Sequence, residues 1–93
     1  MAEQRHIRVV VSGLVQGVFF RASAEQVAKS LGLVGYVRNL PNGDVEIEVQ
    51  GRSETVEKML AWARHGPSTA QVENVELTEL PKDLGLSGFS IRR

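Results

Sequence analysis

A glycine-bearing segment followed by an arginine is the part of this sequence best suited to bind an anion. Glycines stand at both ends of residues 13–17, and Arg21 follows a few positions later. A glycine-bearing turn between a strand and a helix aims backbone N–H groups at one point, and such a concavity binds anions. An arginine guanidinium grips two phosphate oxygens and stays charged at any working pH. We therefore predict a phosphate-sized site here; a plain strand–helix connection and a surface arginine are the alternatives.

The position of Arg21 supports that prediction. It falls at or just inside the start of a helix that we expect over residues 22–31. A cation there is disfavoured by the positive end of the helix dipole, by up to ~1 kcal/mol. A bound anion would remove this conflict.

A second candidate is the asparagine that closes the next strand-like run. Asn39 precedes a tight-turn signal at residues 41–44. Its amide both donates and accepts hydrogen bonds and could hold a water molecule in place. The alternative is that Asn39 only starts the turn. Because side chains alternate along a strand, we expect Arg38 on the opposite face, in solvent.

The remaining polar side chains are weaker candidates. His6 and His65 lack a second ligand at metal spacing, so we expect surface or capping groups. Ser12 and Ser23 flank the glycine segment, but no histidine is placed to activate either. We expect Trp62 to be a packing residue. The acidic residues of the strands are expected to face solvent, and a carboxylate pair for acid–base catalysis stays open: Glu46, Glu48, Glu73, Glu76 and Glu79.

Strands and helices that could position these side chains follow from the apolar pattern. Helical spacing predicts one helix over residues 22–31 and a second from an N-cap at Ser53 to Gly66-Pro67. Each helix has a single apolar stripe, which favours two helices on one face of an antiparallel sheet. This is an α+β, ferredoxin-like α/β sandwich, β-α-β-β-α-β plus a short C-terminal strand. The predicted strands cover residues 7–11, 33–40, 45–50, 72–80 and 89–91, the second and third joined as a hairpin.

Composition sets the limits of this interpretation. The 93 residues are 42% hydrophobic and 24% charged, as in one globular domain covering residues 1–93. Eleven basic residues balance eleven acidic ones, so no net field attracts nucleic acid or a membrane surface. The absence of cysteine excludes disulfides, thiolate metal sites and a cysteine nucleophile. No apolar run approaches ~18 residues, and we expect a cytoplasmic protein.

Two motifs, in this order and at this separation, resemble those of the acylphosphatase family. They are Gly13-x-Val15-Gln16-Gly17-Val18-x-Phe20-Arg21 and Gly35-Tyr36-Val37-Arg38-Asn39-x-x-Asn42-Gly43-x-Val45-Glu46. Gly66-Pro67 and the closing Gly88-Phe89-Ser90-Ile91-Arg92 also resemble family features, so the resemblance covers nearly all of the chain. The family's ferredoxin-like sandwich agrees with the element order predicted above.

The resemblance implies hydrolysis of acyl phosphates to a carboxylate and inorganic phosphate, without metal or cofactor. The catalytic arginine and asparagine of the family match Arg21 and Asn39. Inorganic phosphate would be product and competitive inhibitor, and the protein a monomer. The implied phosphate-binding residues are Val15, Gln16, Gly17, Val18, Phe19 and Phe20.

Two other classes of function compete with this one. Ferredoxin-like sandwiches also bind RNA, but that use needs exposed aromatic residues on central strands and a basic surface. A regulatory module that binds a phosphorylated metabolite without hydrolysing it is the second alternative. The sequence does not identify the acyl group of the substrate.

Overall fold

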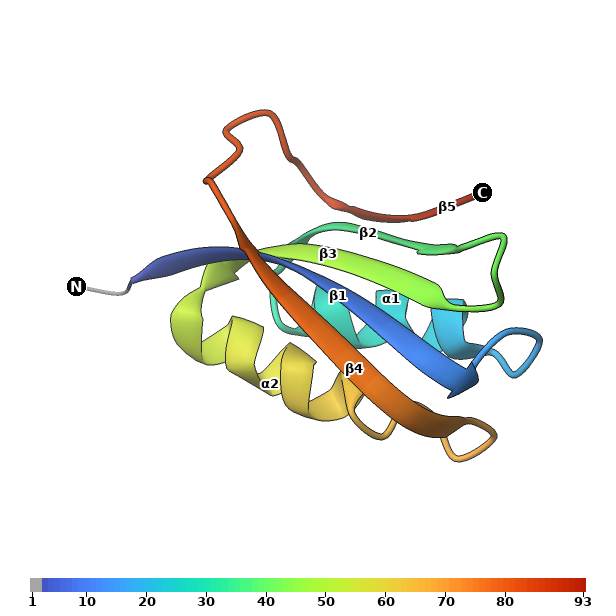
Figure 1. Cartoon of the computed structure of the whole chain (residues 1–93). Helices are drawn as coiled ribbons and strands as arrows, with labels where there is room; N and C mark the ends of the chain where they lie inside the picture. The colour runs from blue at the N-terminus through green and yellow to red at the C-terminus, as the bar shows by residue number, and fades with distance from the viewer. Residues whose placement is uncertain (1–2) are drawn as a thin grey trace.

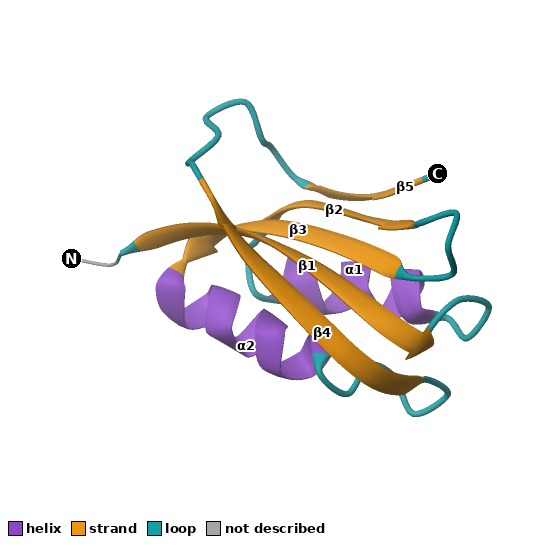
Figure 2. Ribbon diagram, in the orientation of Figure 1, coloured by secondary structure: helices purple, strands orange, loops and turns teal. Residues whose placement is uncertain are grey.

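The computed structural model describes residues 3–93 and confirms the ferredoxin-like fold (Figure 1). One five-stranded sheet has the order β4-β1-β3-β2-β5, in which β2 and β5 are parallel and the other neighbours antiparallel. Both helices cover one face of this sheet, and the other face is left without helices (Figure 2). The elements are β1 (Gln4–Leu14), α1 (Phe20–Ser30), β2 (Val34–Asn39), β3 (Val45–Arg52), α2 (Ser53–Ala63), β4 (Gln71–Leu80) and β5 (Phe89–Arg92).

The core lies between the sheet and the two helices. Alternate residues of the central strands β1 and β3 are fully buried, as the period of two predicts. Phe20, at the start of α1, packs its ring against Trp62 of α2 with centroids 5.2 Å apart. This contact confirms the packing role of Trp62 and anchors the start of α1. The buried helical stripe residues include Ala24, Ala28, Val56, Met59, Leu60 and Ala63.

Element ends differ from the sequence prediction where backbone geometry decides them. β1 runs beyond residues 7–11 to Leu14, because its pairing with β4 continues past a register shift at Ser12/Gly13. Gly13 adopts φ 121°, and a Cβ there would lie 2.3 Å from the carbonyl oxygen of Gln71. Only glycine allows this close approach. The shift bends the end of β1 into the loop that precedes α1.

The predicted N-cap at Ser53 is wrong by one residue. Arg52 is the N-cap of α2, with extended φ and ψ, and Ser53 is already helical. No side chain of the described residues 3–93 forms a capping hydrogen bond at this end. The helix begins directly from β3, whose last pair is Arg52 with Gln4, so the sheet places its first turn.

The helix-free face of the sheet carries a buried ion cluster that contradicts two predictions. Glu46 is 1% exposed, although it was expected to face solvent, and His6 is 5% exposed, although it was expected to be a surface or capping group. Arg8 Nε and Arg38 Nε donate to the carboxylate of Glu46 at 2.5 and 2.7 Å. The Tyr36 hydroxyl donates to it at 2.8 Å. Cross-strand pairing puts these long side chains side by side, so they bury one another.

The cluster continues toward the start of β1. His6 Nε2 lies 3.0 Å from Glu48 Oε2, and His6 Nδ1 lies 2.6 Å from the carbonyl oxygen of Pro81. The chain that leaves β4 thus covers His6. We call Arg8, Tyr36, Arg38, Glu46, Glu48 and His6 the Glu46 cluster.

Charge in the cluster is stabilised by hydrogen bonds. Burial raises the pKa of Glu46, but hydrogen bonds from Arg38, Tyr36 and Arg8 outweigh burial and hold that pKa below its ordinary value. Burial, and then the hydrogen bond to Glu46, raise the pKa of Tyr36. Arg92 lies over the Tyr36 ring, 4.1 Å from its centroid.

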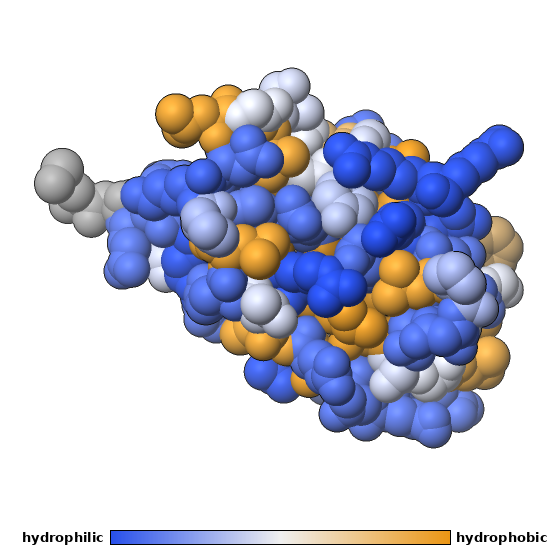
Figure 3. All heavy atoms as spheres, turned by 45° about the horizontal axis from the view of Figure 1, so that its top comes forward, coloured by the Kyte–Doolittle hydropathy of each residue, from blue (hydrophilic) through white to orange (hydrophobic). Residues whose placement is uncertain are grey.

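The surface of this side is mixed in polarity. Figure 3 shows hydrophilic residues over most of it, with apolar residues in small separate groups. Tyr36 is buried under Arg92, so it is not an exposed stacking platform for bases. Within residues 3–93, the helices are all too short or too polar to span a bilayer.

Candidate active site

The loop between β1 and α1 has the backbone of an anion-binding turn. Gly17 adopts φ 73°, and Phe19, the N-cap of α1, adopts φ 63° and ψ 21°. Left-handed residues in a turn of this kind aim successive N–H groups into one concavity. After Leu14, backbone hydrogen bonding within residues 3–93 resumes only in α1. Its first donor is the N–H of Ser23, which donates to the carbonyl oxygen of Phe19 at 3.1 Å. The N–H groups of residues 16–19 therefore have no backbone partner in the part of the chain that the structure describes.

Two side chains fix this loop from opposite sides. Gln16 Nε2 donates to the carbonyl oxygens of Leu40 and Asp44, both at 2.8 Å, in the turn between β2 and β3. Thr69 Oγ1 donates to the carbonyl oxygen of Val18 at 2.5 Å, from the chain between α2 and β4. Leu40 directly follows Asn39, so Gln16 ties the loop to the strand end that carries the asparagine.

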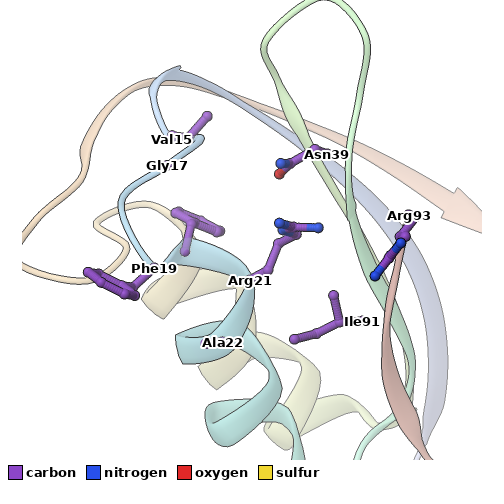
Figure 4. Close-up of a pocket in the computed structure, with 9 residues that line it drawn as sticks. Val15, Gly17, Phe19, Arg21, Ala22, Asn39, Ile91 and Arg93 are labelled. Carbon is purple, nitrogen blue, oxygen red and sulfur yellow. The ribbon is translucent and has the colours of Figure 1, made fainter.

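Arg21 and Asn39 face one cavity, as the sequence predicts. The cavity has a volume of about 490 Å³. Figure 4 shows the Arg21 guanidinium, from the first turn of α1, directly beside the Asn39 amide, from the end of β2. The lining residues are Val15, Gly17, Phe19, Phe20, Arg21, Ala22, Asn39, Ile91 and Arg93.

Both central side chains lack the partners that a purely structural role would require. Asn39 Oδ1 is buried and has no hydrogen-bond partner within residues 3–93. A buried polar atom without a partner costs free energy, so it marks a site where a ligand or water completes the bonding. In the described part of the chain, no carboxylate oxygen lies within 4.0 Å of the Arg21 guanidinium. Its charge is available to an anion.

The other predicted loop residues divide into two groups. Val15, Gly17, Phe19 and Phe20 line the cavity. The side chains of Gln16 and Val18 do not: Gln16 reaches the β2–β3 turn and Val18 packs against the core. Any contact of Gln16 or Val18 with phosphate is therefore left to the backbone.

Sequence reasoning missed Ala22 and the contribution of β5. Ile91 and Arg93 reach the cavity because β5 pairs with β2 in parallel, with Val37 opposite Ile91. The sequence pattern predicts the pairing of β2 with β3, but it does not show which strand lies on the other side of β2. The sequence signal that could have indicated this contribution is the pair of arginines that follows the last predicted strand. One of them, Arg93, adds a second guanidinium to the cavity that Arg21 lines.

None of the acidic residues, histidines or serines considered above lines the cavity. The described residues contain no group of three or more His, Cys, Asp or Glu side chains placed to hold a metal ion. The cavity thus offers two guanidinium groups, backbone N–H groups and one amide. These groups suit a tetrahedral anion beside a fixed water molecule.

Comparisons with known proteins agree on one family. A family model described as Acylphosphatase matches residues 7–91. The chain is 46% identical to the acylphosphatase of Rubrobacter xylanophilus over 90 residues, which cover 97% of this chain and 82% of that protein.

Solved structures of acylphosphatases have the same fold. The structure from Coxiella burnetii has a TM-score of 0.87 and 40% identity, with 96% of this chain and 93% of that chain covered. The structure from Bacillus subtilis has a TM-score of 0.91 and 30% identity, with 98% of this chain and 100% of that chain covered.

Proposed function

This chain belongs to the acylphosphatase family, and we propose that its cavity hydrolyses acyl phosphates, the mixed anhydrides of a carboxylic acid and phosphoric acid. The observation that carries the proposal is the pair of unsatisfied groups, Arg21 and Asn39 Oδ1, facing one cavity at the end of the anion-binding loop. The products are a carboxylate and inorganic phosphate.

Arg21 and the loop hold the phosphate group. The guanidinium and the N–H groups of residues 16–19 bind the non-bridging oxygens, where charge gathers in the transition state of phosphoryl transfer. These donors are fixed before substrate arrives, because Gln16 and Thr69 hold the loop. Preorganised donors lower the barrier without reorganising during the reaction.

Asn39 orients the attacking water. Its unpartnered oxygen accepts a hydrogen bond from a water molecule, and a lone pair of that water oxygen then points toward phosphorus. The water oxygen forms a bond to phosphorus while the bond from phosphorus to the bridging acyl oxygen breaks. The electron pair leaves with the carboxylate, and a phosphate oxygen of the substrate takes the proton of the water.

A carboxylate is a good leaving group, so the reaction needs no acid to expel it. This agrees with a lining in which, among the described residues, the polar side chains are two arginines and one asparagine. Inorganic phosphate, which has the same oxygens, is expected to compete with substrate. The monomeric state and the cytoplasmic location remain predictions from the sequence.

The test is hydrolysis of benzoyl phosphate, followed by its ultraviolet absorbance, with a chelator present. We expect turnover that is lost in Arg21→Ala and kept in Arg52→Ala, a matched control at an exposed arginine paired with Glu54. Turnover that stops when the chelator is added would contradict the metal-free mechanism. Binding of inorganic phosphate without any turnover would instead identify a regulatory phosphate-binding module.

A further inference from the structure

Arg93 brings a second guanidinium to the cavity, and the mechanism proposed above does not use it. Its side chain lines the cavity together with Arg21. Among residues 3–93, no Asp or Glu side-chain oxygen lies within 4.0 Å of either guanidinium. Two cations that face one cavity repel each other, so each is stabilised by an anion. The phosphate group binds to Arg21 and the loop, which leaves Arg93 for a different anionic group.

The pairing of β5 decides which arginine at its end reaches the cavity. β5 runs parallel to β2, with Arg38 opposite Arg92. Side chains alternate between the two faces of a strand. Arg92 lies over the Tyr36 ring on the helix-free face, whereas Ile91 and Arg93, the residues on either side of it, line the cavity. The position of Arg93 thus follows from the packing of its neighbour.

The phosphate-binding loop and Arg93 lie on opposite sides of the cavity. Figure 4 shows the loop at Gly17 on one side and β5 with Ile91 and Arg93 on the other. Arg21 and Asn39 lie between them. The volume of about 490 Å³ is that of a pocket for a small organic molecule, larger than one phosphate group needs. A phosphate held by the loop and Arg21 therefore leaves the part of the cavity beside β5 for the acyl group.

From these observations, and on the basis of the proposed function, we propose that Arg93 determines specificity by binding an anionic group on the acyl part of the substrate. The preferred substrates are then acyl phosphates whose acyl group carries a carboxylate or a phosphate. Ile91, the other β5 residue in the lining, contacts the carbon atoms between the two anionic groups. Arginine suits this role, because its planar fork binds two oxygens of a carboxylate or phosphate and keeps its charge.

The experiment compares two substrates of similar size that differ in charge, para-carboxybenzoyl phosphate and para-methylbenzoyl phosphate. The quantity measured is the ratio of their kcat/KM values, charged over neutral, at low ionic strength. We expect this ratio to fall about 3- to 10-fold in Arg93→Gln, the effect of losing an ion pair that is open to solvent. Arg93→Lys keeps the charge, so the ratio should fall less in that variant.

Binding without turnover gives a second readout. Alkylphosphonates that end in a carboxylate are compared with alkylphosphonates of the same length that end in a methyl group, with dissociation constants measured by calorimetry. Their flexible chains let the carboxylate reach Arg93. We expect the carboxylate to tighten binding to the wild type and to lose this advantage in Arg93→Gln. Added salt should weaken the advantage in the wild type, because it screens exposed charges.

Arg92→Gln is the matched control. It removes the same charge from the neighbouring residue of β5, whose side chain does not line the cavity. The ratio of the two kcat/KM values should change by less than about twofold, because salt and water screen a charge on the other face of the sheet. Equal changes in Arg92→Gln and Arg93→Gln would mean that net charge sets the preference, which overturns the proposal.

Two further results would overturn the proposal. No change for either substrate in Arg93→Gln would leave its guanidinium without a role in specificity. Equal losses for both substrates, together with weaker binding of inorganic phosphate, would assign Arg93 to the phosphate group itself. Failure of the wild type to hydrolyse either substrate would contradict the proposed function. Since calorimetry needs no turnover, the phosphonates still test Arg93 in that case, which separates the two failures.

Discussion

Arg38 and Asn39 are consecutive residues of β2, yet their side chains have opposite surroundings. Arg38 points to the helix-free face and donates to Glu46 within a cluster whose carboxylates are bound by neighbours. Asn39 points to the cavity, and its buried Oδ1 has no partner among residues 3–93. Both regions are polar and both lie against a tightly packed sheet.

The difference between them separates structure from function. The Glu46 cluster satisfies its own hydrogen bonds, so it needs no ligand and we expect it to stabilise the fold. The cavity leaves an arginine, an amide oxygen and several N–H groups for a ligand to complete, at a cost to the free protein. Unsatisfied polar groups that converge on one cavity are therefore a better guide to the site than charge density.

Removing Arg21 should have the largest effect on activity and the least on the fold. We expect Arg21→Ala to lower kcat/KM by about 10³- to 10⁵-fold, the range for an arginine that stabilises phosphoryl transfer. Inorganic phosphate should also bind more weakly. Steady-state kinetics measure the effect on activity, and the midpoint of thermal unfolding measures the effect on the fold. A large drop in the midpoint of thermal unfolding would mean that Arg21 also stabilises the fold, as the Glu46 cluster does.

Asn39→Ala should lower kcat by about 10²- to 10³-fold while the inhibition constant of inorganic phosphate stays near the wild-type value. The reason is that, in the proposed mechanism, the amide contacts the water and not the phosphate oxygens. Since the substitution removes a buried unsatisfied oxygen, the protein should lose little stability. Near-normal kcat in this variant would exclude Asn39 as the group that orients water.

Gln16→Met tests the link between the two halves of the site. The substitution keeps the length of the side chain and removes both hydrogen bonds to the β2–β3 turn. We expect kcat to fall by about 10- to 100-fold, because a small displacement of loop and asparagine misaligns attack.

A double-mutant cycle decides between positioning and general loosening. If Gln16 acts by placing the loop relative to Asn39, then Gln16→Met should lower kcat much less in the Asn39→Ala variant than in the wild type. Additive losses would mean that Gln16 only supports the loop. Thr69→Val, which removes the hydrogen bond on the other side of the loop, is the comparison variant.

Glu46→Gln should affect stability and not activity, the opposite of Arg21→Ala. We expect a normal kcat and a lower free energy of unfolding. We expect a loss of about 2 kcal/mol, modest for a buried carboxylate because Arg8 and Arg38 are partly exposed and remain hydrated. Urea unfolding at neutral pH measures it. Loss of activity in folded Glu46→Gln would show that the two regions are not separate.

The same carboxylate predicts a small pH effect. Its pKa is lower in the folded protein than in the unfolded chain, so its stabilisation is fully present above the ordinary glutamate pKa of about 4.3. That stabilisation is lost as the pH falls from there through the folded-state pKa. On acidification below about pH 4.3, the free energy of unfolding should therefore fall less in Glu46→Gln than in the wild type. Urea unfolding measured at a series of pH values from neutral to below the ordinary glutamate pKa would show this.

The sequence predicts the fold well, because the fold depends on short-range patterns, and the two side chains that it singles out, Arg21 and Asn39, line one cavity. Period-two and helical spacing place the elements, and the two motifs place Arg21 and Asn39. Burial of Glu46 and His6 could not be predicted, since it depends on which long side chains meet across strands. The pairing of β5 with β2, which brings Ile91 and Arg93 to the cavity, depends on contacts between distant residues. The hydrogen bonds of Gln16 across the loop depend on them too.

Because Arg38 and Asn39 point to opposite faces of β2, the Glu46 cluster fixes the register of β2 against β3 and thereby the side chain that faces the cavity. A slip of β2 by one residue against β3 would turn every side chain to the other face. It would place the amide of Asn39 against the buried carboxylate of Glu46 and the guanidinium of Arg38 inside the cavity. Glu46 would then lose a cationic partner, so that pairing is excluded. Residues outside the cavity lining thereby ensure that asparagine, and not arginine, faces the cavity at this position.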